Sequence, residues 1–186
     1  MSSTKRIGFV GGRDDETTKR YQAGYTAGAR AVDAAMKVDV AYLPAGGGAL
    51  DPEQAKAMAL TQLAAGSDLV FGAPRELGPP LAAAALERGG GARAIGVDVD
   101  AAEAAEPAVR SVVLTSMVKR FDVAMTEVLK RFVEGRLAPG QLRFGLARDG
   151  VELSVAGGLL SVEAVARVDE LRQQILSGQV QVPTAP

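Results

Sequence analysis

The stretch Arg6-Ile7-Gly8-Phe9-Val10-Gly11-Gly12 decides the fold of this chain. Its apolar run is typical of a strand buried on both faces of a parallel sheet, and the glycines after it indicate a tight turn. Three further apolar runs alternate with helical patterns along the first half of the chain. Strands are expected at residues 7–10, 38–43, 68–71 and 94–97, and helices at residues 16–35, 52–66 and 79–88. This alternation predicts an α/β fold with an open, doubly wound, mostly parallel sheet.

The second half of the chain has a different pattern. A short strand at 112–114 precedes a long amphipathic helix at 117–134, a hairpin of 141–146 with 151–153, and a closing helix at 162–176. We therefore expect a Rossmann-like lobe over residues 1–110. Residues 111–186 are expected to form crossover and C-terminal segments that pack on the lobe or on a second subunit, outside the first sheet.

The composition excludes several kinds of chemistry. The 186 residues include neither cysteine nor histidine, so disulfides, thiolate nucleophiles, Ser-His triads and the usual zinc and copper ligands are ruled out. Lysine and arginine number 21 against 22 aspartates and glutamates, without runs of like charge, so a nucleic-acid surface is not expected. Carboxylates, lysines and hydroxyls are left, and we expect binding without a metal or cofactor and without enzymatic turnover.

No segment approaches the roughly 20 apolar residues that a membrane helix requires. The N-terminal residues contain neither the apolar stretch of a signal peptide nor a lipobox cysteine. As written, the sequence predicts a cytoplasmic protein without membrane insertion. A fragment of a longer exported protein would have the same sequence and would be located in the periplasm or at the cell surface.

The carboxyl ends of the expected strands are the places where open α/β sheets bind ligands. The candidates at these ends are Gly11, Gly12, Arg13, the loop 44–48 with its Gly46-Gly47-Gly48 run, Phe71 and Asp98. The glycines are equally well explained by tight turns, and Phe71 by packing in the core. Asp98 directly follows a buried strand, where its carboxylate is favourably positioned to accept hydrogen bonds from hydroxyl groups.

Several segments resemble one known family in their order along the chain. They are IGFVGG (7–12), DPEQAKAMAL (51–60), GSDLVFGA (66–73), IGVDVD (95–100) and VVLTSMVKRFDVAM (112–125). The most specific is LTSMVKR followed by Asp122. This order is similar to that of the basic membrane protein family, substrate-binding lipoproteins of ABC importers that include purine nucleoside receptors. The resemblance implies the type I periplasmic-binding-protein fold.

The resemblance also implies a ligand site. In the family a nucleoside is clamped between two lobes, with an aspartate of the GVDxD segment on the ribose hydroxyls and a lysine of the LTSxxKR segment nearby. These roles fall on Asp98 and Lys119, with Arg120 as an alternative for the lysine and a solvated helix position as the alternative role of Lys119. At the loop after Phe71 the resemblance is weaker, because residues 73–78 replace a glycine-rich stretch of the family.

The resemblance covers about the latter two thirds of a typical family member, and the first lobe has no counterpart. Segments from about residue 116 onward partly belong to that lobe in the family. The apolar residues that would then lack a partner are Val118, Phe121, Val128, Leu129 and Phe132. We therefore predict a homodimer or, as the alternative, refolding of these segments onto the first sheet.

Three function classes follow. We expect a small-molecule binding protein, with a purine nucleoside as ligand and an ABC importer as a possible partner. The alternative is a cytoplasmic interaction or regulatory protein of the same fold whose ligand site has degenerated. An enzyme is disfavoured, because Asp14, Asp98 and Asp100 have no nucleophile or metal cluster at a suitable spacing.

Overall fold

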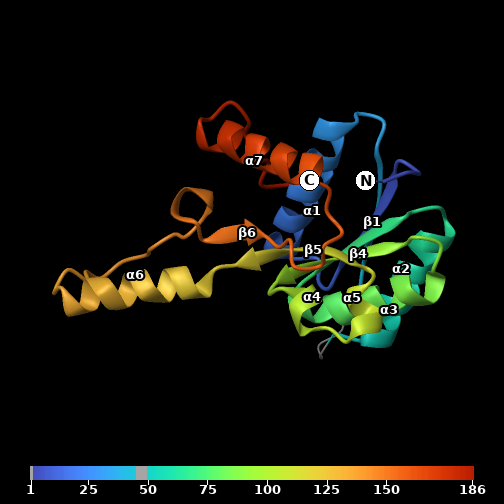
Figure 1. Cartoon of the computed structure of the whole chain (residues 1–186), viewed down its shortest axis with the longest axis horizontal. Helices are drawn as coiled ribbons and strands as arrows, with labels where there is room; N and C mark the ends of the chain where they lie inside the picture. The colour runs from blue at the N-terminus through green and yellow to red at the C-terminus, as the bar shows by residue number, and fades with distance from the viewer. Residues whose placement is uncertain (1, 45–49) are drawn as a thin grey trace.

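The computed structural model describes residues 2–44 and 50–186. It contains one six-stranded sheet with the strand order β2-β1-β3-β4-β5-β6 (Figure 1). The strands are β1 Arg6–Gly11, β2 Lys37–Tyr42, β3 Leu69–Ala73, β4 Arg93–Asp98, β5 Val113–Lys119 and β6 Val151–Leu153. Neighbours among the first five pair in parallel, and β6 pairs antiparallel with β5. The predicted α/β class with a mostly parallel, doubly wound sheet is confirmed.

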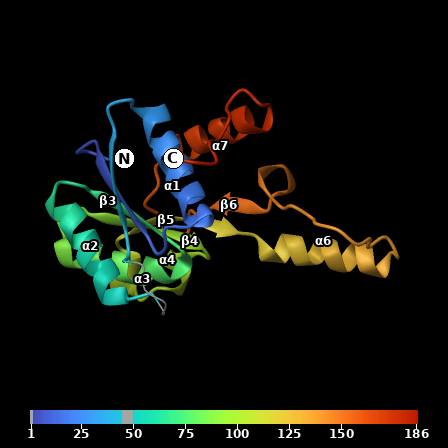
Figure 2. The same cartoon turned by 180° about the vertical axis from the view of Figure 1, so that it is seen from behind.

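Helices cover both faces of this sheet (Figures 1 and 2). On one face lie α2 Pro52–Ala64, α3 Gly78–Arg88, α4 Ala101–Ala104 and α5 Pro107–Arg110, with the short 3-10 turn η1 Arg75–Leu77 before α3. On the other face lies α1 Glu16–Val32, with α7 Val162–Leu176 on the same side. Polar caps fix the helix starts: Asp15, Asp51 and Ser161 accept hydrogen bonds from backbone N–H groups of α1, α2 and α7.

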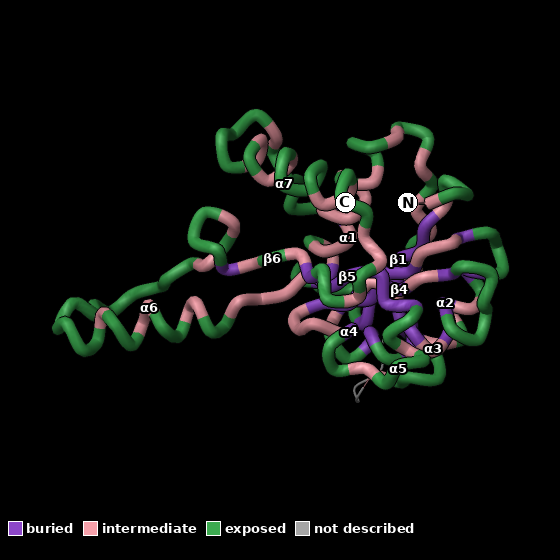
Figure 3. Tube along the Cα trace, viewed as in Figure 1, coloured by how far each residue is buried: buried purple, intermediate pink, exposed green. Residues whose placement is uncertain are grey.

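The core is divided by the sheet into an aliphatic and an aromatic part. Leu63 of α2 and Leu81 of α3 are almost completely buried against the strands on one face. On the α1 face Phe9 and Phe71 form an edge-to-face pair with ring centroids 5.6 Å apart, and Tyr25 of α1 packs on Phe71 at 5.1 Å. Figure 3 shows the buried residues gathered in the centre of the sheet and beneath it. The strands whose carboxyl ends form the candidate site are therefore packed on both faces.

One helix leaves this body. α6 Phe121–Val133 has no buried residue and projects away from the sheet, after which the chain returns to the short turn η2 Leu146–Arg148 and to β6 (Figures 1 and 3). Phe121 and Phe132 are each 67% exposed, and Leu129 is 54% exposed. The expectation that apolar residues of this segment lack a partner within the chain is confirmed for these three.

Two predictions about the second half are wrong. The helix expected from Met117 begins at Phe121, because β5 continues to Lys119 and is hydrogen-bonded to β4 on one edge and to β6 on the other. The hairpin of 141–146 with 151–153 does not form: β6 pairs with β5 instead, in a register that joins Met117 to Leu153. An unpaired β5 edge would leave backbone groups without partners, and β6 satisfies them. Both strands thus extend the first sheet rather than lying outside it.

Candidate functional site

Three elements bring polar side chains together at the carboxyl edge of the sheet. Asp98 ends β4, Lys119 ends β5, and Tyr21 lies on α1. The ammonium Nζ of Lys119 is 2.7 Å from Asp98 Oδ1, and the hydroxyl of Tyr21 donates to the same oxygen at 3.3 Å. Nζ also lies 5.7 Å from the centre of the Tyr21 ring, within cation–π range. The structure therefore brings together the two residues that the resemblance assigned to one ligand.

The backbone explains how Asp98 reaches this position. In the parallel register Asp98 is opposite Val118, so Lys119 follows immediately on the neighbouring strand. Asp98 itself has a φ of 70°, in the left-handed region that residues other than glycine rarely adopt. Local strain of this kind is characteristic of residues held in place at functional sites. The turn directs the carboxylate toward Lys119 and Tyr21 rather than into solvent.

Lys119 and Asp98 carry opposite charges, and one oxygen of the Asp98 carboxylate takes no part in their contact. Burial opposes the charge of the Lys119 ammonium, but hydrogen bonds to Asp98 and Tyr21 outweigh it and raise the pKa of the lysine above its ordinary value. The side chains remain 38% and 22% exposed for Lys119 and Asp98. Both contacts go to Oδ1, and within the described residues Oδ2 of Asp98 has no hydrogen-bond partner. This oxygen is an acceptor open to a ligand hydroxyl.

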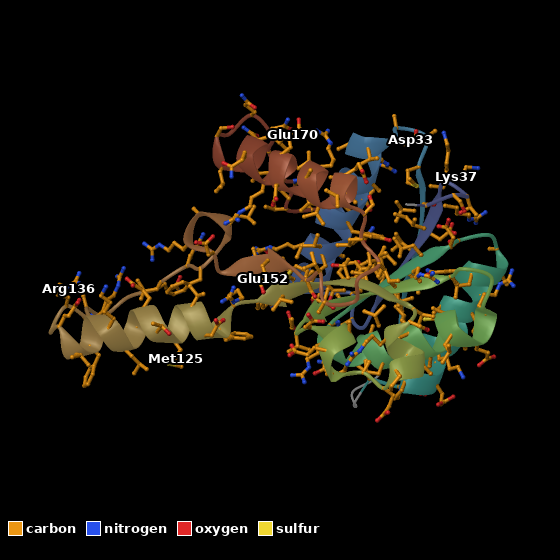
Figure 4. The ribbon with its side chains drawn as sticks, viewed as in Figure 1. Asp33, Lys37, Met125, Arg136, Glu152 and Glu170 are labelled. Carbon is orange, nitrogen blue, oxygen red and sulfur yellow. The ribbon has the colours of Figure 1, made fainter. Side chains whose placement is uncertain are left out.

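A hollow of about 480 Å³ opens beside this pair at the foot of α6. Its lining is rich in charged residues: Asp98, Asp100, Glu103, Asp122 and Glu152 against Lys119 and Arg120, with Val99, Val118 and Phe121. Arg120 is already engaged, at 2.6 Å from both Asp122 and Glu152, and these carboxylates raise its pKa. Figure 4 shows Glu152 at this junction. Lys119 is consequently better placed than Arg120 to contact a ligand near Asp98.

A second layer of hydrogen bonds holds the hollow in shape. Asp100 caps α4 by accepting from the N–H groups of Ala102 and Glu103, and the hydroxyl of Ser154 donates to its other oxygen. Thr115 donates to the carbonyl of Ser154 at 2.7 Å. Sequence reasoning missed Ser154 and Tyr21. The spacing of Tyr21 and Tyr25 on one helix face was the available signal for the tyrosine.

The other predicted site residues lie at the same sheet edge but are not joined to the Asp98 pair by hydrogen bonds among the described residues. A methyl group on Gly11 would meet the Tyr42 ring at 2.4 Å, and one on Gly12 would meet Pro74 Cδ at 2.7 Å. These glycines thus have a packing reason to be there. Arg13 is exposed beyond β1, and Phe71 is buried in the aromatic core. A ligand contact for any of the four stays a prediction, and the 46–48 loop lies outside the described residues.

The described residues contain no group of three or more acidic side chains positioned to hold a metal ion. Within the same residues no helix is long and apolar enough to cross a membrane.

An open, polar hollow at the carboxyl ends of the strands lies where α/β sheets of this kind bind their ligands. Over residues 1–185 the chain matches the family described as ABC transporter substrate-binding protein PnrA-like, and it belongs to that family. The family resemblance drawn from the sequence motifs is thereby confirmed.

Curated relatives match nearly the whole chain, and a solved structure shares its fold. The CD4+ T-cell-stimulating antigen of Listeria monocytogenes is 31% identical over 196 residues, which cover all of this chain and 54% of that protein. The ABC transporter nucleoside-binding protein BmpA of Lactococcus lactis is 24% identical, over 98% of this chain and 54% of that protein. An ABC transporter solute-binding protein from Conexibacter woesei shares the fold, with a TM-score of 0.79 at 22% identity, over 98% of this chain and 58% of that one. The chain spans about half the length of the curated relatives it matches.

Proposed function

We propose that this chain binds a purine nucleoside without turnover, as part of the substrate-binding component of an ABC importer. The observation that carries the proposal is the Asp98 carboxylate, which Lys119 and Tyr21 hold through one oxygen while the other stays open. Family membership supports the substrate-binding role, and the name of the Lactococcus lactis relative supports a nucleoside.

In the proposed complex Oδ2 of Asp98 accepts hydrogen bonds from the vicinal ribose hydroxyls, and Lys119 donates to an acceptor on the sugar or base. Residues 1–110 then form the lobe that holds the ligand. Residues 111–186 supply Lys119 and the segments that lead to a second lobe or subunit, which would close the site. A carboxylate paired with an ammonium favours hydroxyl-rich neutral ligands over anions, because an anion would be repelled by Asp98 and the surrounding acidic residues.

Recognition without chemistry is consistent with the same geometry. Among the described residues the partners of Asp98 are the ammonium of Lys119 and the phenol of Tyr21, and the sequence offers neither a histidine base nor a thiol. In an importer the bound nucleoside would be handed on at the outer face of the membrane, so this proposal places the working protein outside the cytoplasm. The alternative, a regulatory protein of the same fold whose ligand site has degenerated, is less favoured, because the Asp98 and Lys119 side chains are still in contact.

The test is isothermal titration of the chain with inosine, guanosine and adenosine, and with the 2′-deoxy form of whichever binds. The matched variant is Asp98→Asn, which keeps the size of the side chain and its tolerance for the left-handed backbone but removes the charge. Hydrogen bonds to charged groups contribute about 1.5–3 kcal/mol, so the variant should bind about 10-fold to 150-fold more weakly. The 2′-deoxynucleoside should show a similar loss with the unchanged chain.

Asp33→Asn is the control, because this aspartate lies at the end of α1 beside Lys5 and far from the hollow (Figure 4). It should leave affinity unchanged. A chain that takes up none of the three nucleosides, or an Asp98→Asn variant that binds as tightly as the unchanged chain, would contradict the proposal.

A further inference from the structure

The surface of α6 forms a continuous apolar stripe that the chain itself leaves uncovered. Phe121, Met125, Leu129 and Phe132 recur at intervals of four, four and three residues and therefore share one helix face. All four are more than half exposed, as is Val133 at 83%. Single exposed apolar residues are common, but an uncovered stripe on a projecting helix marks an interaction surface.

The two ends of this helix differ in charge. Its free end, which we call the tip (residues 130–136), carries Lys130, Arg131 and Arg136 against Glu134. At its other end lies the hollow, where five carboxylates face two cations. Arg131 is paired with Glu127 and Arg136 with Glu134, so the positive charge of the tip comes chiefly from Lys130, whereas the hollow is negative. In Figure 4 the labelled Arg136 lies at the far end of α6 and Glu152 at its base.

The length of the helix relates these two charged ends to each other. Thirteen residues at about 1.5 Å each give a helix of about 20 Å, with the hollow at the start and the tip at the end. Two such helices packed antiparallel bring each tip over the other's hollow and oppose their dipoles favourably. Packed parallel, they would place tip against tip and hollow against hollow, so that like charges would meet.

We propose that two copies of this chain pair their α6 helices antiparallel, so that the basic tip of each covers the acidic hollow of the other. The pairing is a two-fold, self-complementary interface in which the same stripe serves both copies. It deepens the proposed function, on which it rests in one respect: if the hollow holds the ligand, the partner's tip supplies a second wall to that site. Burial of the apolar stripe stabilises the dimer, and the charges favour the antiparallel over the parallel orientation of the two helices.

Sedimentation across a range of concentrations tests the pairing. The unchanged chain should form dimers that dissociate on dilution. Leu129→Glu should abolish them, whereas Leu86→Glu, at a half-exposed leucine of α3, should leave them intact as the matched control. If Leu129→Glu and Leu86→Glu have equal effects, or if the chain is monomeric at every concentration reached, the proposal is overturned. A monomer would mean that another polypeptide covers α6, such as one matching the remaining half of the relatives.

A charge exchange tests the contact between tip and hollow. Lys130→Glu and Glu103→Lys should each raise the dimer dissociation constant by about tenfold, and the double variant should recover most of that loss. Among the described residues neither side chain forms an ion pair within 4 Å, and the one interaction that Lys130→Glu changes within the monomer is with Glu127, whose pKa is lowered by Arg131 and, to a smaller extent, by Lys130. An unchanged dissociation constant in both single variants, or no recovery in the double variant, would overturn this part of the inference.

Disulfide cross-linking tests the relative orientation of the two α6 helices. The chain has no native cysteine that could form a competing disulfide. Antiparallel helices bring residue 121 of one copy near residue 133 of the other. A mixture of Phe121→Cys and Val133→Cys chains should therefore form a mixed disulfide, while either chain alone should not cross-link. Disulfides within each single variant would indicate parallel packing and refute the antiparallel arrangement.

The proposed nucleoside binding and the proposed pairing of α6 can be refuted independently of each other. Dimerisation is measured without nucleoside, so a dimer that binds none would refute the proposed function and leave the interface standing. A monomer that binds nucleoside would refute the interface and leave the function standing.

Discussion

The close approach of Gly11 to the Tyr42 ring gives a sharp test of why a glycine stands at the end of β1. In Gly11→Ala the new methyl group would lie 2.4 Å from two carbons of the ring and 3.0 Å from Thr18 Cγ2. Carbon atoms in contact are normally about 3.5–4.0 Å apart, so the ring must move by about 1 Å. Because β2 is an edge strand and Tyr42 is only half-buried, that movement is feasible but disturbs its packing on Phe9.

Overpacking of this kind costs about 1–3 kcal/mol, and we expect a free energy of unfolding lowered by about 2 kcal/mol. For a chain of this length the melting temperature should fall by roughly 4–8 °C. Urea unfolding followed by circular dichroism gives the free energy directly, from the shift of the midpoint at constant slope.

Two variants make the reasoning specific. Gly28→Ala is the control: Gly28 lies in α1 with no atom within 4 Å of the added methyl group, so the change should stabilise the chain by about 0.5–1 kcal/mol. Tyr42→Val removes the obstructing ring, and in the double variant Gly11→Ala should cost at least about 1 kcal/mol less than it does alone. Should Gly11→Ala be neutral, or its cost be the same with and without Tyr42, the packing explanation of this glycine fails and direct ligand contact gains weight.

Two further predictions concern stability. Leu81→Ala removes a completely buried side chain and should destabilise the chain by about 2–5 kcal/mol in urea unfolding, whereas Leu129→Ala, measured in dilute protein, should change it by less than about 0.5 kcal/mol. Equal costs would mean that α6 is packed in the monomer. The raised pKa of Lys119 means that its pairing with Asp98 stabilises the fold fully below the ordinary lysine pKa of 10.5 and that this contribution is lost as the pH rises through the raised value. The urea midpoints of the unchanged chain and of Asp98→Asn should therefore converge at strongly alkaline pH. A difference between the two midpoints that stays the same at every pH would contradict this role of the pair.

The first half of the fold was predictable because its signals are local and agree with one another. Apolar runs flanked by glycines gave β1, β3 and β4 to within a residue or two, and Asp51 before Pro52 marked the start of α2. In the second half the deciding interactions are not local. Residues 117–119 fit a helical pattern as well as a strand, and only pairing with β4 and with the distant β6 selects the strand.

The site was predictable only in part for the same reason. Asp98 and Lys119 were assigned to one ligand by resemblance, and the structure adds the cause of their contact, which is the adjacent parallel ends of β4 and β5. The spacing of Tyr21 and Tyr25 indicates that the two tyrosines share one face of α1, but nothing local shows that this face meets the end of β4. Its hydroxyl reaches Asp98 across 77 residues of sequence.

The open geometry of the hollow links ligand affinity to association. Binding sites for small molecules usually bury 70–90% or more of the ligand surface, and a hollow with one wall covers one side of a nucleoside. A second wall supplied by a partner's tip would add contacts only in the dimer, so ligand and partner would each bind more tightly in the presence of the other. By linkage the two gains must be equal in free energy. The Asp98 pair is already formed without ligand, so this coupling would reside in the closing wall and not in any rearrangement of Lys119.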